Sequence, residues 1–162
     1  MIAEQADQND RQGALNRPVE ILLVEDNYGD ALLAKEAFAA ARYESNVTVA
    51  ADGEEALAML YKKPPYQAQP RPDLILLDLN LPKRDGREVL ETIKSDPSLK
   101  LIPVVVLTGS RAESEVLRSY ALHANAYVVK PVNFERLKEI VATIENFWLS
   151  LVVLPPHGAQ AL

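Results

Sequence analysis

Short apolar runs recur along the chain, and each is followed by a longer stretch whose apolar residues are spaced as on one helix face. Such runs, with little polar alternation, are typical of strands buried on both faces. The strand-like segments are residues 21–24, 46–50, 74–77, 104–107 and 126–129, and the helix-like segments are 28–41, 54–62, 87–95, 113–123 and 134–148. Alternating strands and helices favour a parallel sheet. We therefore expect an α/β fold, a doubly wound five-stranded parallel sheet with helices on both faces.

The composition excludes several kinds of site and partner. The chain of 162 residues has no cysteine and two histidines, so disulfides, thiolate zinc sites and cysteine nucleophiles are excluded. Its formal net charge of −6 disfavours direct binding to nucleic acid. No apolar stretch reaches the roughly 18 residues of a membrane span, and the polar N-terminus lacks a signal-peptide pattern. We expect a cytoplasmic protein that binds neither nucleic acid nor membranes.

Polar side chains follow four of the predicted strands directly. Glu25 and Asp26 end the first run, Asp78 the third, Thr108 the fourth and Lys130 the fifth. The carboxyl ends of parallel strands lie at one edge of a sheet, where open α/β sheets bind their ligands. Each of these residues alone would be typical of a solvated strand end. Together they predict one site, provided that the strands are parallel.

The predicted cluster has the chemistry of a phosphoryl site. Three carboxylates at Glu25, Asp26 and Asp78 repel one another unless a cation joins them, and oxygen ligands favour Mg²⁺ or Mn²⁺. Lys130 supplies a point charge for a phosphate oxygen, and Thr108 supplies a hydroxyl donor. The central carboxylate, Asp78, could attack phosphorus and form an aspartyl phosphate.

Four stretches together resemble the receiver domain of two-component response regulators. They are residues 22–27 (LLVEDN), 76–82 (LLDLNLP) with Asp85-Gly86, 106–108 (VLT) and 127–131 (YVVKP). They occur in the family's order across about residues 19–148, which is more specific than any single motif. The resemblance implies the receiver, or flavodoxin-like, strand order 2-1-3-4-5. It also implies that Asp78 accepts a phosphoryl group from a phosphohistidine of a sensor histidine kinase.

The same resemblance implies the metal ligands. Asp26, Asp78 and the backbone carbonyl of Asn80 would hold Mg²⁺, with Glu25 acting mostly through water.

It further implies the residues that respond to phosphorylation. Thr108 and Lys130 would contact the phosphoryl oxygens, and Tyr127 matches the aromatic residue that changes rotamer with Thr108 in this family. Such a change would bias the surface between two states.

A narrower resemblance concerns the kinase partner. The proline-rich insert before Asp73, residues 87–90, residues 101–108 and residues 147–149 are similar to the small regulators paired with cyanobacterial phytochromes. The resemblance implies a light-controlled histidine kinase as the partner.

The ends of the chain are expected to differ from the domain between them. We expect a disordered N-terminal tail over residues 1–18, a receiver domain over 19–149 and an apolar extension over 150–162, without an output domain.

Residues 147–154 (FWLSLVVL) are too apolar for one helix face to bury, which favours a homodimer built on the last helix, the last strand and this tail. Its expected interface residues are Tyr127, Phe147, Trp148 and Leu151. The alternative is that Phe147 or Trp148 packs on the domain and the remainder frays.

Two other functions remain open beside that of a phosphoacceptor that is not an enzyme. A phosphohydrolase with an aspartyl nucleophile usually carries Asp-x-Asp after the first strand, whereas this strand ends in Glu25-Asp26-Asn27. No glycine-rich phosphate loop occurs either. A pseudo-receiver scaffold would work without phosphorylation, although all the site residues of a working receiver are present.

Overall fold

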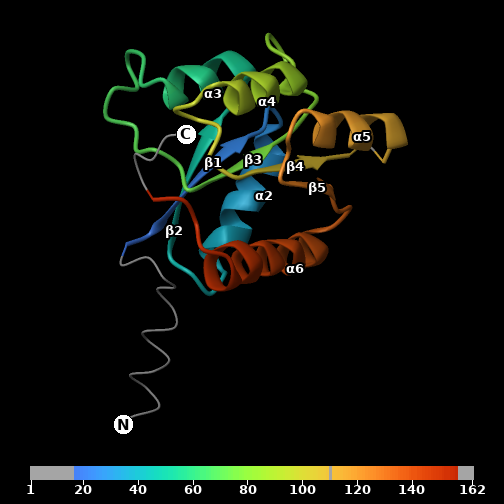
Figure 1. Ribbon diagram of the computed structural model, residues 1–162. Helices are drawn as coiled ribbons and strands as arrows, with labels where there is room; N and C mark the ends of the chain where they lie inside the picture. Colours follow the sequence, from blue (N-terminus) through green and yellow to red (C-terminus); the bar gives the residue numbers. More distant parts are fainter. Residues whose placement is uncertain (1–16, 110, 157–162) are drawn as a thin grey trace.

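A five-stranded parallel sheet forms the centre of the molecule, between two layers of helices (Figure 1). The computed structural model describes residues 17–109 and 111–156. The strands are β1 (Val19–Val24), β2 (Ser45–Ala50), β3 (Leu74–Leu77), β4 (Val104–Thr108) and β5 (Ala126–Val129). Their order is β2-β1-β3-β4-β5, and all neighbouring pairs are parallel. The expected fold class and strand order are confirmed.

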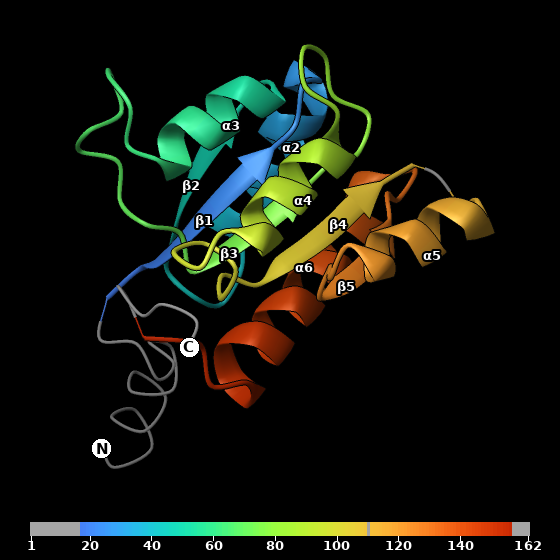
Figure 2. The same cartoon turned by 45° about the horizontal axis from the view of Figure 1, so that its top comes forward.

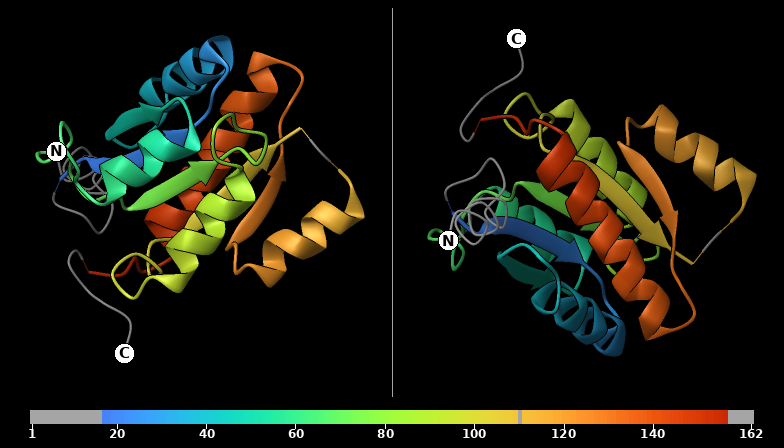
Figure 3. Two further views of the ribbon diagram at one scale, coloured as in Figure 1. Left: turned by 90° about the horizontal axis from the view of Figure 1, so that it is seen from above. Right: turned by 90° about the horizontal axis from the view of Figure 1, so that it is seen from below.

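Helices cover both faces of this sheet. The α-helices of the described residues are α2 (Tyr28–Ala39), α3 (Gly53–Leu60), α4 (Gly86–Ser95), α5 (Glu113–Ala121) and α6 (Phe134–Glu145). Helices α3 and α4 lie on one face and α2 and α6 on the other (Figure 3). Helix α5 lies at the edge of the sheet, next to β5 (Figure 2). None of these helices is long and apolar enough to span a bilayer.

Alternate side chains of the central strands enter two separate cores. Leu22 and Val24 of β1 pack into the core under α3 and α4, whereas Ile21 and Leu23 enter the core under α2 and α6. This burial on both faces explains why the strand is a continuous apolar run in the sequence.

The C-terminal helix departs from the expected regular helix over residues 134–148. The α-helix ends at Glu145 and continues as a π-helical turn, η1 (Asn146–Leu151), closed by a hydrogen bond from the Val152 N–H to the Phe147 carbonyl. The wider turn brings Ile144 and Leu149, five residues apart, into the same core. The sequence pattern had assigned the last core position to Trp148, which is half-buried.

The first described residues of the chain contact the domain. Residues 1–16 of the expected disordered tail lie outside the described residues. Its last two residues belong to the domain, because the Arg17 guanidinium forms two 2.8 Å hydrogen bonds with the Asp73 carboxylate.

Part of the expected apolar extension packs on the domain. Leu154 contacts the core under α2 and α6, and Pro155 and Pro156 lie next to Arg71 and Pro103. Residues 157–162 lie outside the described residues.

Candidate functional site

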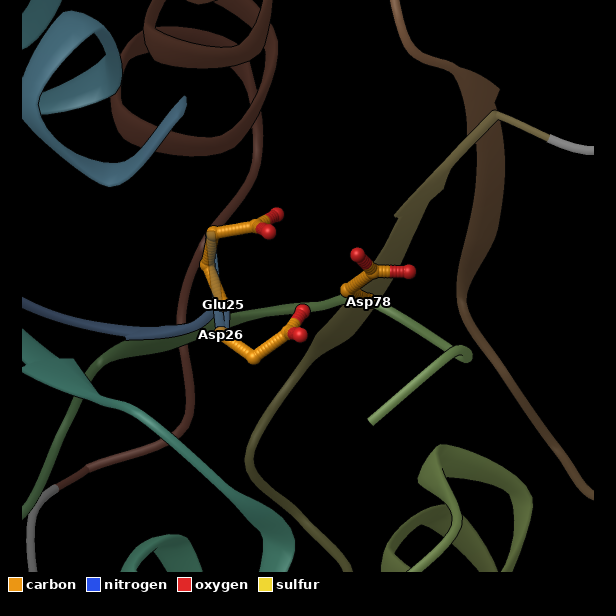
Figure 4. Close-up of side chains that lie close together, drawn as sticks. All are labelled: Glu25, Asp26 and Asp78. Atoms are coloured by element: carbon orange, nitrogen blue, oxygen red, sulfur yellow. The ribbon is translucent and has the colours of Figure 1, made fainter. Parts of the chain in front are cut away.

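Three carboxylates meet where β1 and β3 end (Figure 4). Glu25 and Asp26 follow β1, and Asp78 follows β3. One carboxylate oxygen from each lies within 4.8 Å of the others. Glu25 and Asp78 are buried, whereas Asp26 is exposed. The structure therefore brings together the acidic residues that the sequence placed at strand ends, with one of them open to solvent.

Backbone hydrogen bonds extend the sheet to these residues. The Glu25 N–H donates to the Ala50 carbonyl and the Asp78 N–H to the Val24 carbonyl, both at 3.0 Å. The Asp78 Oδ1 atom accepts a 3.1 Å hydrogen bond from the N–H of Asn80, which is itself exposed. These hydrogen bonds continue the sheet pairing past the strand ends and fix the backbone positions of Glu25 and Asp78.

Gly86 at the start of α4 lies directly against the backbone of Asp78. A Cβ atom at position 86 would lie 2.4 Å from the Asp78 carbonyl oxygen and 2.5 Å from the Leu79 Cα atom. A side chain at this position would therefore displace the loop that carries Asp78. The close approach explains the Asp85-Gly86 pair noted in the sequence.

The ammonium group of Lys130 joins the cluster from the end of β5. Its Nζ atom lies 2.5 Å from Glu25 Oε2, 2.8 Å from Asp78 Oδ2 and 3.4 Å from Asp30 Oδ2. Burial opposes the charged amine, yet the bonds to Asp78 and Glu25 outweigh it and raise the Lys130 pKa. The lysine therefore stays charged and partly neutralises the carboxylates.

Burial lowers the pKa of the Lys130 amine but raises the pKa of the Glu25 carboxyl. It raises the pKa of the Glu25 carboxyl above its usual range, although Lys130 and a 3.0 Å hydrogen bond from the Asn27 N–H favour the charged form. The acid is thus costly to ionise in this structure without further positive charge nearby.

Sequence reasoning missed the contact between Asp30 and Lys130. Asp30 lies in the first turn of α2, four residues after Asp26, where acidic residues are common because they favour helix N-termini. An acidic residue at this position therefore gave no indication in the sequence that Asp30 also contacts Lys130, as the third carboxylate near its ammonium group.

Thr108 and Tyr127 lie on the neighbouring strands. The Thr108 side chain is fully buried, and its hydroxyl has no hydrogen-bond partner among the described residues. The Thr108 carbonyl accepts a 2.8 Å hydrogen bond from the Lys130 N–H, which ties β4 to β5 at the site. Tyr127 is half-buried against the core under α3 and α4. The hydroxyl of Thr108 is thus unpaired but enclosed in this arrangement of the strand ends.

The expected dimer residues do not form one patch. Trp148 packs against the core under α2 and α6, whereas Tyr127 packs against the opposite core. Phe147 and Leu151 are exposed, and the Phe147 ring stands edge-on to Trp148 with centroids 5.3 Å apart. Phe147 and Leu151 are therefore the members of the set that offer an apolar surface.

An apolar cavity of about 160 Å³ opens beside the acidic cluster, between α2 and α6. Leu33 and Leu137 line it, and Lys130 lies at its polar end. Tyr28, on the same helix as Leu33, is 81% exposed, and Val132, which also lines the cavity, is fully exposed. The surface next to the charged cluster is therefore apolar.

Comparison with known proteins agrees with this geometry. The family model described as the response regulator receiver domain matches residues 21–142. The response regulator Rcp1 of Synechocystis sp. is 49% identical over 140 residues, which are 86% of this chain and 95% of that protein.

Solved structures give the same result. The phosphorylated cyanobacterial phytochrome response regulator RcpA matches with a TM-score of 0.82 and 51% identity, over 86% of this chain and all of that one. The Mn²⁺-bound form of Rcp1 matches with a TM-score of 0.80 and 49% identity, over the same shares. The chain belongs to the receiver-domain family of two-component response regulators and is closely related to phytochrome-associated members.

Proposed function

We propose that Asp78 accepts a phosphoryl group from a phosphohistidine of a sensor histidine kinase of the phytochrome type, in the cytoplasm. The observation that carries the proposal is the position of the Asp78 carboxylate, between two further carboxylates and the Lys130 ammonium at 2.8 Å. A carboxylate held in this way combines a nucleophile with the charges that a phosphoryl group requires.

The donor set fits a hard divalent cation, Mg²⁺ or Mn²⁺. Only oxygen ligands are present among the three clustered side chains, and the exposure of Asp26 leaves the cluster open to solvent. Asp26, Asp78 and the Asn80 carbonyl would hold the ion, with Glu25 acting mostly through water. When bound, it supplies positive charge to the phosphoryl oxygens. The Mn²⁺-bound structure of Rcp1 supports this proposal by analogy.

Asp78, Lys130 and Thr108 have different roles in the phosphoryl transfer. An Asp78 oxygen forms the new bond to phosphorus while the bond from phosphorus to the histidine nitrogen breaks. Lys130 neutralises charge on the phosphoryl oxygens and holds the Asp78 carboxylate in place. The unpaired Thr108 hydroxyl donates to another of these oxygens. The inward movement of Thr108 frees space for Tyr127 to turn, which changes the surface of the domain.

The apolar surface around the cavity supports a protein as phosphodonor. The donor histidine must come within bonding distance of Asp78, so its protein must cover the adjoining surface. Leu33 and Val132, which line the cavity, expose apolar side chains there. Such a patch is typical of a protein contact.

We also propose that the chain forms a homodimer through its C-terminal helix and the following segment, with β5 at the border of the interface. Phe147 and Leu151 are 49% and 71% exposed, and Val153 is 91% exposed. Sedimentation velocity at tens of micromolar should show a dimer that Leu151→Glu converts to a monomer. A monomeric wild-type protein, with and without acetyl phosphate, contradicts the proposal.

Incubation with Mg²⁺ and acetyl phosphate tests the phosphoacceptor role. Intact mass should show a gain of one phosphoryl group in the wild-type protein and none in Asp78→Asn, because the amide cannot act as the nucleophile. Glu36→Gln, an exposed change on α2, should be phosphorylated like the wild type.

The same assay separates the two alternatives. A pseudo-receiver scaffold would gain no mass under any of these conditions. A phosphohydrolase would show steady turnover of phosphate esters, whereas receiver domains act as signalling switches.

A further inference from the structure

Helix α5 is the least buried of the helices in the described part of the chain. Ser119 is its only buried residue, and no side chain caps its N-terminus. The other helices each bury four residues. In Figure 3, α5 stands away from the two helix layers, beside β5. Few apolar contacts therefore fix its position.

An arginine of α4, Arg87, joins α4 to α5 through an ion pair. The Arg87 guanidinium donates to both oxygens of Asp85 at 3.2 Å and, through its second terminal nitrogen, to Oε1 of Glu115 on α5. The side chains of Arg87 and Glu115 are only 14% and 25% exposed. Ion pairs that are partly shielded from water are screened less than surface pairs, so this one can hold the two helices together.

Arg87 also lies close to the phosphoacceptor loop. It follows Gly86, whose N–H donates to the Leu79 carbonyl at 3.0 Å and whose Cα packs against the backbone of Asp78. Glu115 lies seven residues beyond Thr108, at the other end of the segment that leaves β4. The ion pair thus links the segment that follows Asp78 to the segment that follows Thr108.

Unpaired polar atoms are concentrated along the same path. Four buried side-chain atoms have no hydrogen-bond partner among the described residues, and three of them belong to Thr108, Glu115 and Ser119. A buried polar atom without a hydrogen bond destabilises the arrangement that contains it. The observed arrangement of α5 therefore leaves polar groups without hydrogen bonds both at the end of β4 and within the helix.

We propose that the ion pair between Arg87 and Glu115 is a latch that holds α5 in its resting arrangement, and that phosphorylation of Asp78 releases it. The release rests on the function proposed above, because Thr108 must move toward the phosphoryl group to pull on the segment before α5. Arg87 is thus a positioning residue for the response, because its side chain bonds to Asp85 and Glu115 and not to the acidic cluster. An open polar cavity of about 450 Å³, lined by both residues of the pair, leaves room for this movement.

Peptide-resolved hydrogen exchange on the full chain tests the latch. Arg87→Met keeps the packing of the aliphatic stem and removes the charge, and Glu115→Gln weakens the pair from the other side. In the unphosphorylated protein, both changes should speed exchange in residues 113–121 by about fivefold while α2 is unaffected. The matched control is Glu88→Gln, which lines the same cavity but pairs with Arg84 of its own segment. It should leave α5 unchanged.

The second arm adds Mg²⁺ and acetyl phosphate, with intact mass recorded on the same samples. Phosphorylation should speed exchange of α5 in the wild type and have little further effect in Arg87→Met, because its latch is already open. A purely structural arginine would leave the effect of phosphorylation equal in both proteins, and that result overturns the proposal. Unchanged exchange of α5 in both variants overturns it as well. If no mass is gained, the phosphoacceptor role fails and the release with it, while the first arm still decides whether Arg87 holds α5.

Discussion

Helices α5 and α6 begin at the same edge of the sheet but are held to it in different ways. Asn133 caps α6, and Leu137, Val141 and Ile144 bury its inner face in the core. Helix α5 has no side-chain cap, buries only Ser119, and is joined to α4 by the ion pair between Arg87 and Glu115. One helix is anchored by a core and the other by an electrostatic contact that a local change can break.

The difference matches the residues that precede each helix. Lys130, before α6, must stay in place because its charge holds the Asp78 carboxylate. Thr108, before α5, must be able to move if its unpaired hydroxyl is to reach a phosphoryl oxygen. Lys130 thus precedes α6, which is well packed, whereas Thr108 precedes α5, which is weakly packed.

Truncating one side chain in α6 and one in α5 should give the largest difference in the free energy of unfolding. Ile144→Ala should lower the free energy of unfolding by about 3 kcal/mol, because it leaves a cavity in the core. Leu117→Ala in α5 should change it by less than about 0.5 kcal/mol, because that side chain is 63% exposed. Urea unfolding followed by circular dichroism measures both.

The two variants share the size of the deleted group, so each serves as the control for the other. Equal losses of stability would mean that α5 is as firmly packed as α6. The latch would then have little to hold.

The sequence predicted the sheet and its acidic cluster well, for a physical reason. Burial on both faces makes a parallel strand a continuous apolar run, and parallel strands must place Glu25, Asp78 and Lys130 at one edge. These inferences need the direction of the strands and nothing finer. The fold class and the cluster therefore followed from the pattern, whereas the strand order followed from the resemblance to receiver domains.

Contacts between helices were beyond such reasoning. The pairing of Arg87 with Glu115, and of Asp30 with Lys130, depends on how each helix is rotated about its axis. Both helices of the first pair read as amphipathic segments, and no pattern distinguished the weak packing of α5. The π-helical turn at Asn146 was missed because it changes the spacing of core residues from four to five within one helix.

A smaller effect is expected from the one acid buried in the anchored helix. Glu145, at the end of α6, is 1% exposed; its Oε2 atom accepts a 3.4 Å hydrogen bond from the Tyr43 N–H, and Oε1 has no partner among the described residues. Burial raises the pKa of this carboxyl to about 7 from an ordinary 4.5. The folded protein thus keeps a proton that the unfolded chain releases above pH 4.5.

Glu145 therefore stabilises the folded state fully below pH 4.5, and this contribution is lost as the pH rises to about 7. Glu145→Gln carries no charge, so it should match the wild type near pH 4.5 and exceed it by on the order of 2 kcal/mol at pH 8. Urea unfolding at both pH values measures the difference, with Glu139→Gln as a control on the exposed side of α6. A gap that is the same at both pH values would mean that the pKa of the acid is equal in the folded and unfolded protein, so that the acid is ionised in the folded protein at pH 8. The anchored helix would then contain a buried charge, and its stability would rest on apolar packing strong enough to tolerate one.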